Sequence, residues 1–283
     1  MVIPAYRAEA YLSRTVGSVL RQTAPVSEIV IASDDGQDYV AILADQAVRD
    51  PRIRCVSTGG TGTGVARARN TALHAATGQV VVSLDADDLL EPEALAVLGP
   101  LALAHGAAYS NHQVVDFASG AQLPNYNSVL PEGRLRLPEV LTSNLHTYAC
   151  IAFDRQRLAH VGWPAEISRW EDVLFFAACA DALGALYYTP QHLYVYHRRQ
   201  GSICNRPQTE EEFKRWAMWL LQALGEHAEL RYRDPASERA LRAYFRGQIA
   251  LQTDFQQRLL AGEQIDYQRF VRDNVQRLAP GPA

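Results

Sequence analysis

Short apolar segments alternate with amphipathic helical segments through residues 1–90, and this alternation restricts the fold more than any other feature of the chain. The apolar segments have the length of buried strands and lie at residues 1–5, 28–32, 53–57 and 80–84. The segments between them carry apolar residues at helical spacing and predict helices at about residues 12–21, 39–48 and 65–76. Strands and helices that alternate in this way form a parallel sheet with right-handed crossover connections. The sequence therefore predicts an α/β fold that opens with a β-α-β-α-β-α-β series.

Composition and charge argue against several classes of protein. The chain has 283 residues, of which 48% are hydrophobic and 20% charged, enough for one large α/β domain or two small ones. Its net charge of −4 argues against a nucleic-acid binder with a broad basic surface. No apolar run approaches a membrane span and no signal-peptide pattern is found, so we expect a cytoplasmic protein without a transmembrane segment. The widely separated cysteines are expected to be reduced and buried; they are Cys55, Cys150, Cys179 and Cys204.

Three carboxylates follow the fourth predicted strand. Residues 80–88 read V-V-V-S-L-D-A-D-D, which places Asp85, Asp87 and Asp88 at the carboxyl end of that strand. Ligands bind at this end of parallel α/β sheets, and carboxylates this close repel one another unless a cation shares the site. Mg²⁺ and Mn²⁺ prefer oxygen ligands and keep positions open for substrate phosphates. The cluster therefore predicts a metal–diphosphate site, and the alternative is an acidic turn exposed to solvent.

The second half of the chain has a looser pattern and ends in helices. Helices are predicted at about residues 91–104 and 171–183, a loop at 116–138, and strands at 107–110, 148–153, 186–189 and 192–197. Beyond Pro207, a capping box of Thr209 and Glu212 precedes an apolar helical stripe. A further helix is predicted at about residues 237–260, and a last amphipathic piece follows Gly262. We expect this tail to pack on the main domain or on a second subunit, where it would form a homodimer interface.

Five motifs occur in the order typical of one enzyme family. They are V-I-P-A-Y-R-A-E-A-Y-L at 2–12, S-D-D-G at 33–36, G-V-A-R-A-R-N at 64–70, L-D-A-D-D at 84–88 and W-E-D at 170–172. Together they resemble the inverting family 2 glycosyltransferases, which have the GT-A fold; the resemblance is strong over residues 2–92, patchy over 93–202 and absent beyond 207. It implies a Rossmann-like, mostly parallel sheet flanked by helices. It also implies a nucleotide-diphospho-sugar donor, a UDP- or GDP-sugar.

The resemblance divides the chain into a glycosyltransferase domain and a helical extension. The domain would span residues 1–205, with a nucleotide-sugar-binding half at 1–100 and an acceptor-binding half at 101–205. The helical C-terminal extension would span residues 206–283. The loop at 116–138 and the extension are expected to choose a carbohydrate or glycolipid acceptor.

The resemblance also implies which residues contact the base and ribose of the donor. Pro4, Ala5 and Tyr6 would line this part of the cleft, in the turn after the first strand. Asp34 or Asp35 would accept a hydrogen bond from the base, while the other of the pair shapes the turn.

A second group of residues would hold the sugar diphosphate. Arg69 would contact the donor, and Asp85, with Ala86, would face the ribose. Asp87 would bind Mn²⁺ or Mg²⁺, which neutralises the departing diphosphate, and Asp88 would lie behind the metal or on the acceptor side.

An inverting transferase needs a carboxylate that takes the proton from the attacking hydroxyl. We assign this role to Asp172, with Glu171 as the alternate; the other interpretation is an acidic pair that stabilises a helix N-terminus. Trp170 would stack on a sugar ring or belong to the core.

The late segment Tyr196-His197-Arg198-Arg199 resembles a family motif in which His197 replaces the usual Arg. His197 would be a further metal ligand or a structural histidine, because imidazole suits Mn²⁺. Arg198 or Arg199 would hold the diphosphate.

Two other functions remain open from the sequence. The glycines at 59–64 follow a predicted strand and open a helix, which imitates the fingerprint of an NAD(P)-dependent Rossmann oxidoreductase. A catalytically silent sugar-nucleotide-binding paralogue is the second alternative. The interpretation that we favour is a metal-dependent inverting glycosyltransferase of cell-surface polysaccharide, lipopolysaccharide or glycolipid synthesis, cytoplasmic or peripheral at the inner face of the membrane.

Overall fold

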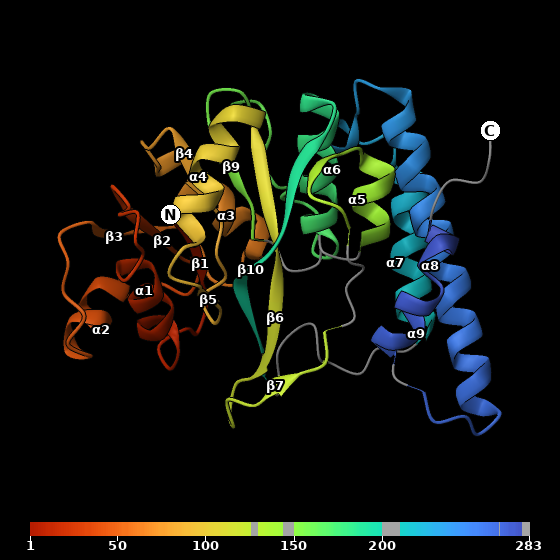
Figure 1. The fold of residues 1–283 in the computed structure, drawn as a ribbon, viewed down its shortest axis with the longest axis horizontal. Helices are drawn as coiled ribbons and strands as arrows, with labels where there is room; N and C mark the ends of the chain where they lie inside the picture. Colours follow the sequence, from red (N-terminus) through yellow and green to blue (C-terminus); the bar gives the residue numbers. More distant parts are fainter. Residues whose placement is uncertain (126–129, 144–149, 200–209, 266, 279–283) are drawn as a thin grey trace.

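Three parallel strands begin the chain in the computed structural model, which describes residues 1–125, 130–143, 150–199, 210–265 and 267–278 (Figure 1). The strands pair in the order β1-β2-β3 and are β1 (Val2–Ala5), β2 (Ile29–Ser33) and β3 (Ile53–Ser57). Each is followed by a helix; these are α1 (Leu12–Leu20), α2 (Tyr39–Asp45) and α3 (Val65–Ala75). The predicted series of alternating strands and helices is confirmed here, with every strand of the series short and apolar.

A second, mixed sheet continues the first. Its strands run in the order β4-β9-β6-β10-β5, with β7 beside β6 and β8 beside β10. Their bounds are β4 (Val80–Val82), β5 (Leu89–Leu90), β6 (Ala107–Asp116), β7 (Gln122–Leu123), β8 (Gly133–Leu135), β9 (Ala152–Asp154) and β10 (Leu186–Arg198). A parallel bridge between Val2 and Ser83 joins the two sheets. β6 and β10 are parallel, whereas β9 is antiparallel to both β4 and β6, so the arrangement as a whole is mixed.

Helices cover both faces of the sheets. The remaining helices are α4 (Ala94–His105), α5 (Leu137–Ser143), α6 (Glu171–Leu183), α7 (Glu210–Ala223), α8 (Pro235–Leu260) and α9 (Tyr267–Asp273), with 3-10 turns at Ala228–Leu230 and Val275–Leu278. Strand β2 shows the division, because Ile29 and Ile31 join the core with α1, α2 and α4, whereas Val30 and Ala32 join the core with α3. A strand buried on both faces is apolar throughout rather than alternating.

The C-terminal helices pack on the main body of the chain. Leu241 and Phe245 of α8 are fully buried and belong to the same core as Val173 and Phe176 of α6. Figure 1 shows α7, α8 and α9 side by side with α5 and α6, at the end of the molecule remote from β3. The expected packing of the tail on its own domain is thus confirmed. No helix within the described ranges is long and apolar enough to cross a membrane.

Several predicted elements of the second half are corrected. The strands expected at 186–189 and 192–197 are one strand, β10, whose pairing with β6 shifts register between Thr189 and Tyr194. Pro190 lacks the N–H group that pairing with a neighbouring strand needs. A β-bulge accommodates Pro190, so the strand continues beyond it. The expected loop at 116–138 contains β7 and β8, and 126–129 lie outside the described residues. The strand expected at 148–153 is β9 at Ala152–Asp154; residues 144–149 are likewise outside.

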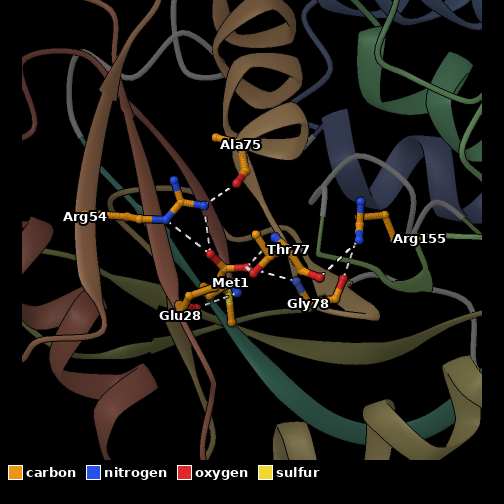
Figure 2. Close-up of polar contacts among 7 residues, drawn as sticks. All are labelled: Met1, Glu28, Arg54, Ala75, Thr77, Gly78 and Arg155. Carbon is orange, nitrogen blue, oxygen red and sulfur yellow. Dashed lines mark hydrogen bonds and ion pairs between the residues drawn. The ribbon is translucent and has the colours of Figure 1, made fainter.

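A polar network ties the two sheets together at the end remote from the acidic turn (Figure 2). Glu28 Oε1 accepts hydrogen bonds from the Thr77 amide at 2.5 Å and from the Gly78 amide at 2.9 Å. Glu28 Oε2 accepts from Arg54 Nη2 of β3 at 2.8 Å. Arg155, just after β9, donates to the Thr77 and Gly78 carbonyls at 3.0 and 2.9 Å. One partly buried carboxylate therefore links β2, β3 and the segment that enters β4.

Candidate active site

The acidic turn at 85–88 is fixed from two sides. Thr15 of α1 donates a hydrogen bond from its hydroxyl to the Ala86 carbonyl at 2.7 Å. Asp88 is 1% exposed and accepts hydrogen bonds from the Tyr194 hydroxyl and from the His197 amide, the latter at 2.7 Å. Burial and the charges of Asp87 and Asp85 raise the pKa of Asp88 well above its ordinary value. Asp88 thus anchors the turn to β10 and lies behind the site, and the turn is not the solvent-exposed loop of the alternative interpretation.

The Asp87 side chain contacts Arg199, whose guanidinium lies over the ring of Tyr11. Arg199 donates from Nε to Asp87 Oδ2 at 3.1 Å, and its guanidinium lies 4.7 Å from the centre of the Tyr11 ring. Burial and the neighbouring Asp85 raise the pKa of Asp87, while Arg199 lowers it. The adjacent Arg198 has an exposed side chain. Of the two arginines proposed for the diphosphate, Arg199 is therefore the one held against the acidic turn.

The imidazole of His197 carries a ring nitrogen without a hydrogen-bond partner among the described residues. The side chain is 3% exposed, and this nitrogen, Nδ1, is buried. Burial and the charge of Arg14 lower the pKa of His197, and the backbone of Asp87 acts in the opposite direction. A neutral imidazole with a free nitrogen is the form that ligates metals. Asp87 offers the oxygen ligand that Mn²⁺ and Mg²⁺ prefer, and an imidazole suits Mn²⁺ better than Mg²⁺.

Within the described ranges, no group of three or more His, Cys, Asp or Glu side chains is placed to hold a metal ion. Asp87 and His197 are two candidate ligands, so a cation bound there would need oxygens from water or from a ligand. This is the usual condition for Mg²⁺ sites in enzymes that act on diphosphates.

Arg69 joins the acidic turn to the start of α6. Its guanidinium is 3% exposed and donates from Nη2 to Asp85 at 2.7 Å and from Nη1 to Glu171 at 3.1 Å. Its Nε atom is buried without a hydrogen-bond partner among the described residues. The bridge brings the L-D-A-D-D and W-E-D motifs into one site. Contact between Arg69 and a donor remains a prediction.

Asp172 lies in the first turn of α6, next to Glu171. Burial and the neighbouring Glu171 charge raise the pKa of Asp172 from 3.8 to about 8, against the influence of Arg69. A carboxylate whose pKa lies near neutrality is suited to accept a proton from a hydroxyl. Glu171 and Asp172 lie at a helix N-terminus, as the interpretation of an acidic pair that stabilises a helix requires. The Arg69 bridge also places this pair beside the acidic turn.

The two aspartates of the S-D-D-G motif have different partners. Asp34 is 3% exposed, and its oxygens accept hydrogen bonds from the Thr58 hydroxyl at 2.7 Å, the Thr63 amide at 3.0 Å and the Gly64 amide at 3.0 Å. Asp34 therefore holds the glycine-rich segment 58–64 in shape. Asp35 is the less buried of the two, and it accepts from the Arg7 amide and the Tyr39 hydroxyl at 2.6 and 2.7 Å. Recognition of a base by either one remains a prediction.

The residues after β1 lie against the glycine-rich segment. Pro4 and Ala5 are buried in β1, whereas Tyr6 is 44% exposed. A Cβ atom added at Gly62 would lie 3.9 Å from the Tyr6 ring, and Gly62 has a φ of 66°, which favours glycine. Tyr6 and the glycine segment thus form one exposed surface, where the sequence predicts the base.

Two contacts of the site had no signal in the sequence motifs, and a third comes from Asn70, which ends the G-V-A-R-A-R-N motif and which the family resemblance predicts to help hold the loop. The Thr15 and Tyr194 hydrogen bonds to the acidic turn come from residues that read only as helix and strand. The Asn70 side chain pairs with the backbone of Trp163, donating at 2.7 Å and accepting at 2.8 Å. A side-chain amide that satisfies both backbone groups of one residue fixes the segment that leads to α6.

Comparison with known proteins gives a family and a fold. The family model described as "Glycosyl transferase family 2" matches residues 1–158. The succinoglycan biosynthesis protein ExoO of Rhizobium meliloti is 29% identical over 217 residues, which cover 71% of this chain and 61% of that protein. The UDP-Glc:alpha-D-GlcNAc-diphosphoundecaprenol beta-1,3-glucosyltransferase WfgD of Escherichia coli is 30% identical over 146 residues, 51% of this chain and 53% of that protein. The chain thus spans less than two thirds of the length of these two relatives.

Solved structures share the fold at low sequence identity. The structure of S. aureus TarS in complex with UDP-GlcNAc has a TM-score of 0.68 at 18% identity, covering 87% of this chain and 71% of that one. The mannosyltransferase PcManGT from Pyrobaculum calidifontis, in complex with GDP-Man and Mn²⁺, has a TM-score of 0.57 at 18% identity, covering 97% of this chain and 78% of that one.

Proposed function

This chain belongs to glycosyl transferase family 2, and from that premise we propose that it transfers a sugar from a nucleotide-diphospho-sugar to an acceptor hydroxyl, with inversion at the anomeric carbon. The observation that carries the proposal is the Arg69 bridge between Asp85 and Glu171. It sets a cluster suited to a cation and diphosphate beside a carboxylate suited to accept a proton. An in-line transfer needs these two parts side by side.

Asp87 and His197 Nδ1 would hold the divalent cation, which supplies charge neutralisation to the departing nucleoside diphosphate when it is bound. The buried, unpartnered Nδ1 of His197 supports this assignment. Arg199, which pairs with Asp87, carries a second positive charge to the same place. A planar guanidinium also suits phosphate oxygens, so Arg199 would contact the diphosphate.

Asp172 would act as the general base. The acceptor oxygen forms a bond to the anomeric carbon as the bond from that carbon to the diphosphate oxygen breaks. Asp172 takes the proton of the acceptor hydroxyl, and the electron pair leaves with the diphosphate. Glu171, fixed by Arg69, keeps a negative charge beside Asp172, and this charge favours proton uptake.

The donor would be a UDP- or GDP-sugar, with its base over Tyr6 and near Asp35. The bound UDP-GlcNAc and GDP-Man named for two structures of the same fold support this donor class. The acceptor would be a carbohydrate or glycolipid of surface-polysaccharide synthesis, at the cytoplasmic face of the membrane. The names of two relatives support it, one from succinoglycan synthesis and one that acts on a diphosphoundecaprenol-linked sugar.

A donor screen followed by one substitution tests the proposal. Melting temperatures are measured with UDP, GDP and NAD, each with and without Mn²⁺, and donors of the stabilising nucleotide are then assayed for hydrolysis and transfer. We expect Mn²⁺-dependent stabilisation by UDP or GDP, turnover by the wild type, and loss of turnover without loss of nucleotide binding in Asp172→Asn. Stabilisation by NAD alone would support the oxidoreductase. Nucleotide binding without any turnover would support the silent paralogue.

A further inference from the structure

We propose that Trp170 is a positioning residue through which the helical extension holds the two carboxylates at the start of α6. The catalytic role of Asp172 in this inference rests on the proposed function. The coupling between the helical extension and the start of α6 rests on contacts within this chain. It makes the helical extension part of the active-site architecture.

Trp170 has a backbone conformation that an L residue with a large side chain rarely adopts. Its φ and ψ are 58° and 21°, in the left-handed region, and it occupies the N-cap of α6 without a side-chain capping bond. Glycine is the usual residue there because it lacks a Cβ atom, whereas a bulky residue stays only where its surroundings offset the cost. The side chain of Trp170 must therefore gain contacts that compensate for its backbone.

The compensating contacts come from the extension. The Trp170 ring meets Phe213 of α7 edge to face, with centroids 5.1 Å apart and planes at 85°. It also meets Phe245 of α8 at 5.4 Å and 61°. Both phenylalanines are buried, at 9% and 0% exposure. Edge-to-face pairs of this kind add to the burial of apolar area, so two helices of the extension clamp this residue.

Trp170 directly precedes Glu171 and Asp172, the two candidate catalytic carboxylates, in the sequence. The Trp170 carbonyl accepts the Leu174 amide at 3.0 Å and so closes the first turn of α6, the turn that carries Glu171 and Asp172. Glu171, in this turn, accepts a hydrogen bond from Arg69 of α3. A change in the Trp170 backbone would rotate this turn, alter the Arg69 contact and move Asp172 relative to the acidic turn.

The test compares two matched phenylalanines of the extension. Phe213→Leu removes an aromatic contact with Trp170, and Phe255→Leu removes one with Phe270 of α9, at 5.6 Å. Both residues are 9% exposed, so the two substitutions remove equally buried rings. Hydrogen exchange of the peptide spanning residues 168–176 is measured in the full-length chain, with kcat, donor KM and the pH profile. Trp170→Phe and Trp170→Ala are measured in parallel.

We expect Phe213→Leu to speed exchange at 168–176 and to lower kcat by about ten-fold with little change in donor KM, since small misplacements of a catalytic group are costly. The pH profile should also move, because the burial and Glu171 contact that set the pKa of Asp172 change. Phe255→Leu should leave all of these at wild-type values. Trp170→Phe should retain most of kcat and Trp170→Ala should not.

Equal exchange at 168–176 in Phe213→Leu and Phe255→Leu would overturn the inference, and so would wild-type kcat and pH profile in Trp170→Ala. If the wild type shows no transfer, the proposed function fails, and the exchange comparison still decides whether the extension holds this turn.

Discussion

The partly buried carboxylate of Glu28 should carry a large share of the stability of this fold (Figure 2). Burial by itself would raise the pKa of Glu28, but hydrogen bonds from the Thr77 amide, Arg54 and the Gly78 amide outweigh it and lower the pKa from 4.5 to about 2. The Glu28 side chain is 12% exposed and the Arg54 side chain 39%, so solvent screens part of the ion pair between them. At about 1.36 kcal/mol per pKa unit, the charged form contributes at most about 3 kcal/mol to the free energy of unfolding.

The sign of the pH dependence follows from the lowered pKa. The stabilisation is fully present above the unfolded pKa of 4.5 and is lost as the pH falls toward the folded value of about 2. Glu28→Gln should therefore lower the free energy of unfolding by about 2 to 3 kcal/mol at pH 7, because Gln cannot accept from both Arg54 and the two amides. The difference from the wild type should shrink between pH 5 and pH 3.

Urea unfolding followed by tryptophan fluorescence measures this difference. The matched control is Glu238→Gln, which removes the same charge from a partly exposed i,i+4 pair with Arg242 on α8. Such pairs are worth about 0.3–0.5 kcal/mol. A Glu28→Gln variant no less stable than Glu238→Gln, or a difference that stays constant as the pH falls, would refute the reasoning.

Three further predictions concern the site. Because burial and Glu171 raise the pKa of Asp172 to about 8, kcat/KM should rise with pH up to about 8, and Glu171→Gln should move this limb to lower pH; an unmoved limb contradicts the assignment. Arg69→Lys should lower kcat by about 100-fold without unfolding the chain, since one ammonium cannot bridge Asp85 and Glu171 as a guanidinium does. Steady-state kinetics would measure kcat and circular dichroism the folded state, and a wild-type kcat would count against the bridge. Asp34→Asn should raise donor KM more than it lowers kcat, because it weakens four hydrogen bonds from the glycine-rich segment. An unchanged KM would separate that segment from donor binding.

The first half of the fold was predictable because each of its elements is local. Strand β2 reads as a continuous apolar run, since both of its faces are buried. In the second half, α6 is predictable with its observed bounds, and its end is marked by Gly184, which has a φ of 75°. The single strand β10 was not predictable, because Pro190 reads as a strand end and only the pairing with β6 shows a bulge there.

The site was predicted as a set of motifs but not as a set of contacts. The sequence does not say which of Arg198 and Arg199 meets the acidic turn, because β10 ends at Arg198 and strand alternation does not extend to Arg199. In the structure, Arg199 is the one that contacts Asp87. Likewise, the sequence gives no sign that Arg69 reaches Glu171, since that contact depends on how α3 and α6 pack. The left-handed backbone of Trp170 also leaves no trace in the sequence, because glycine is absent from that position.

Isothermal titration of UDP and GDP, each with and without Mn²⁺, tests the central claim that the acidic turn binds a cation together with a nucleoside diphosphate. The wild type should bind one of the two nucleotides in a Mn²⁺-dependent manner, and Asp87→Ala should lose that dependence. Asp50→Ala, which removes a carboxylate paired with Arg52 near β3, is the control and should bind as the wild type does. Undiminished Mn²⁺-dependent binding by Asp87→Ala would contradict the account.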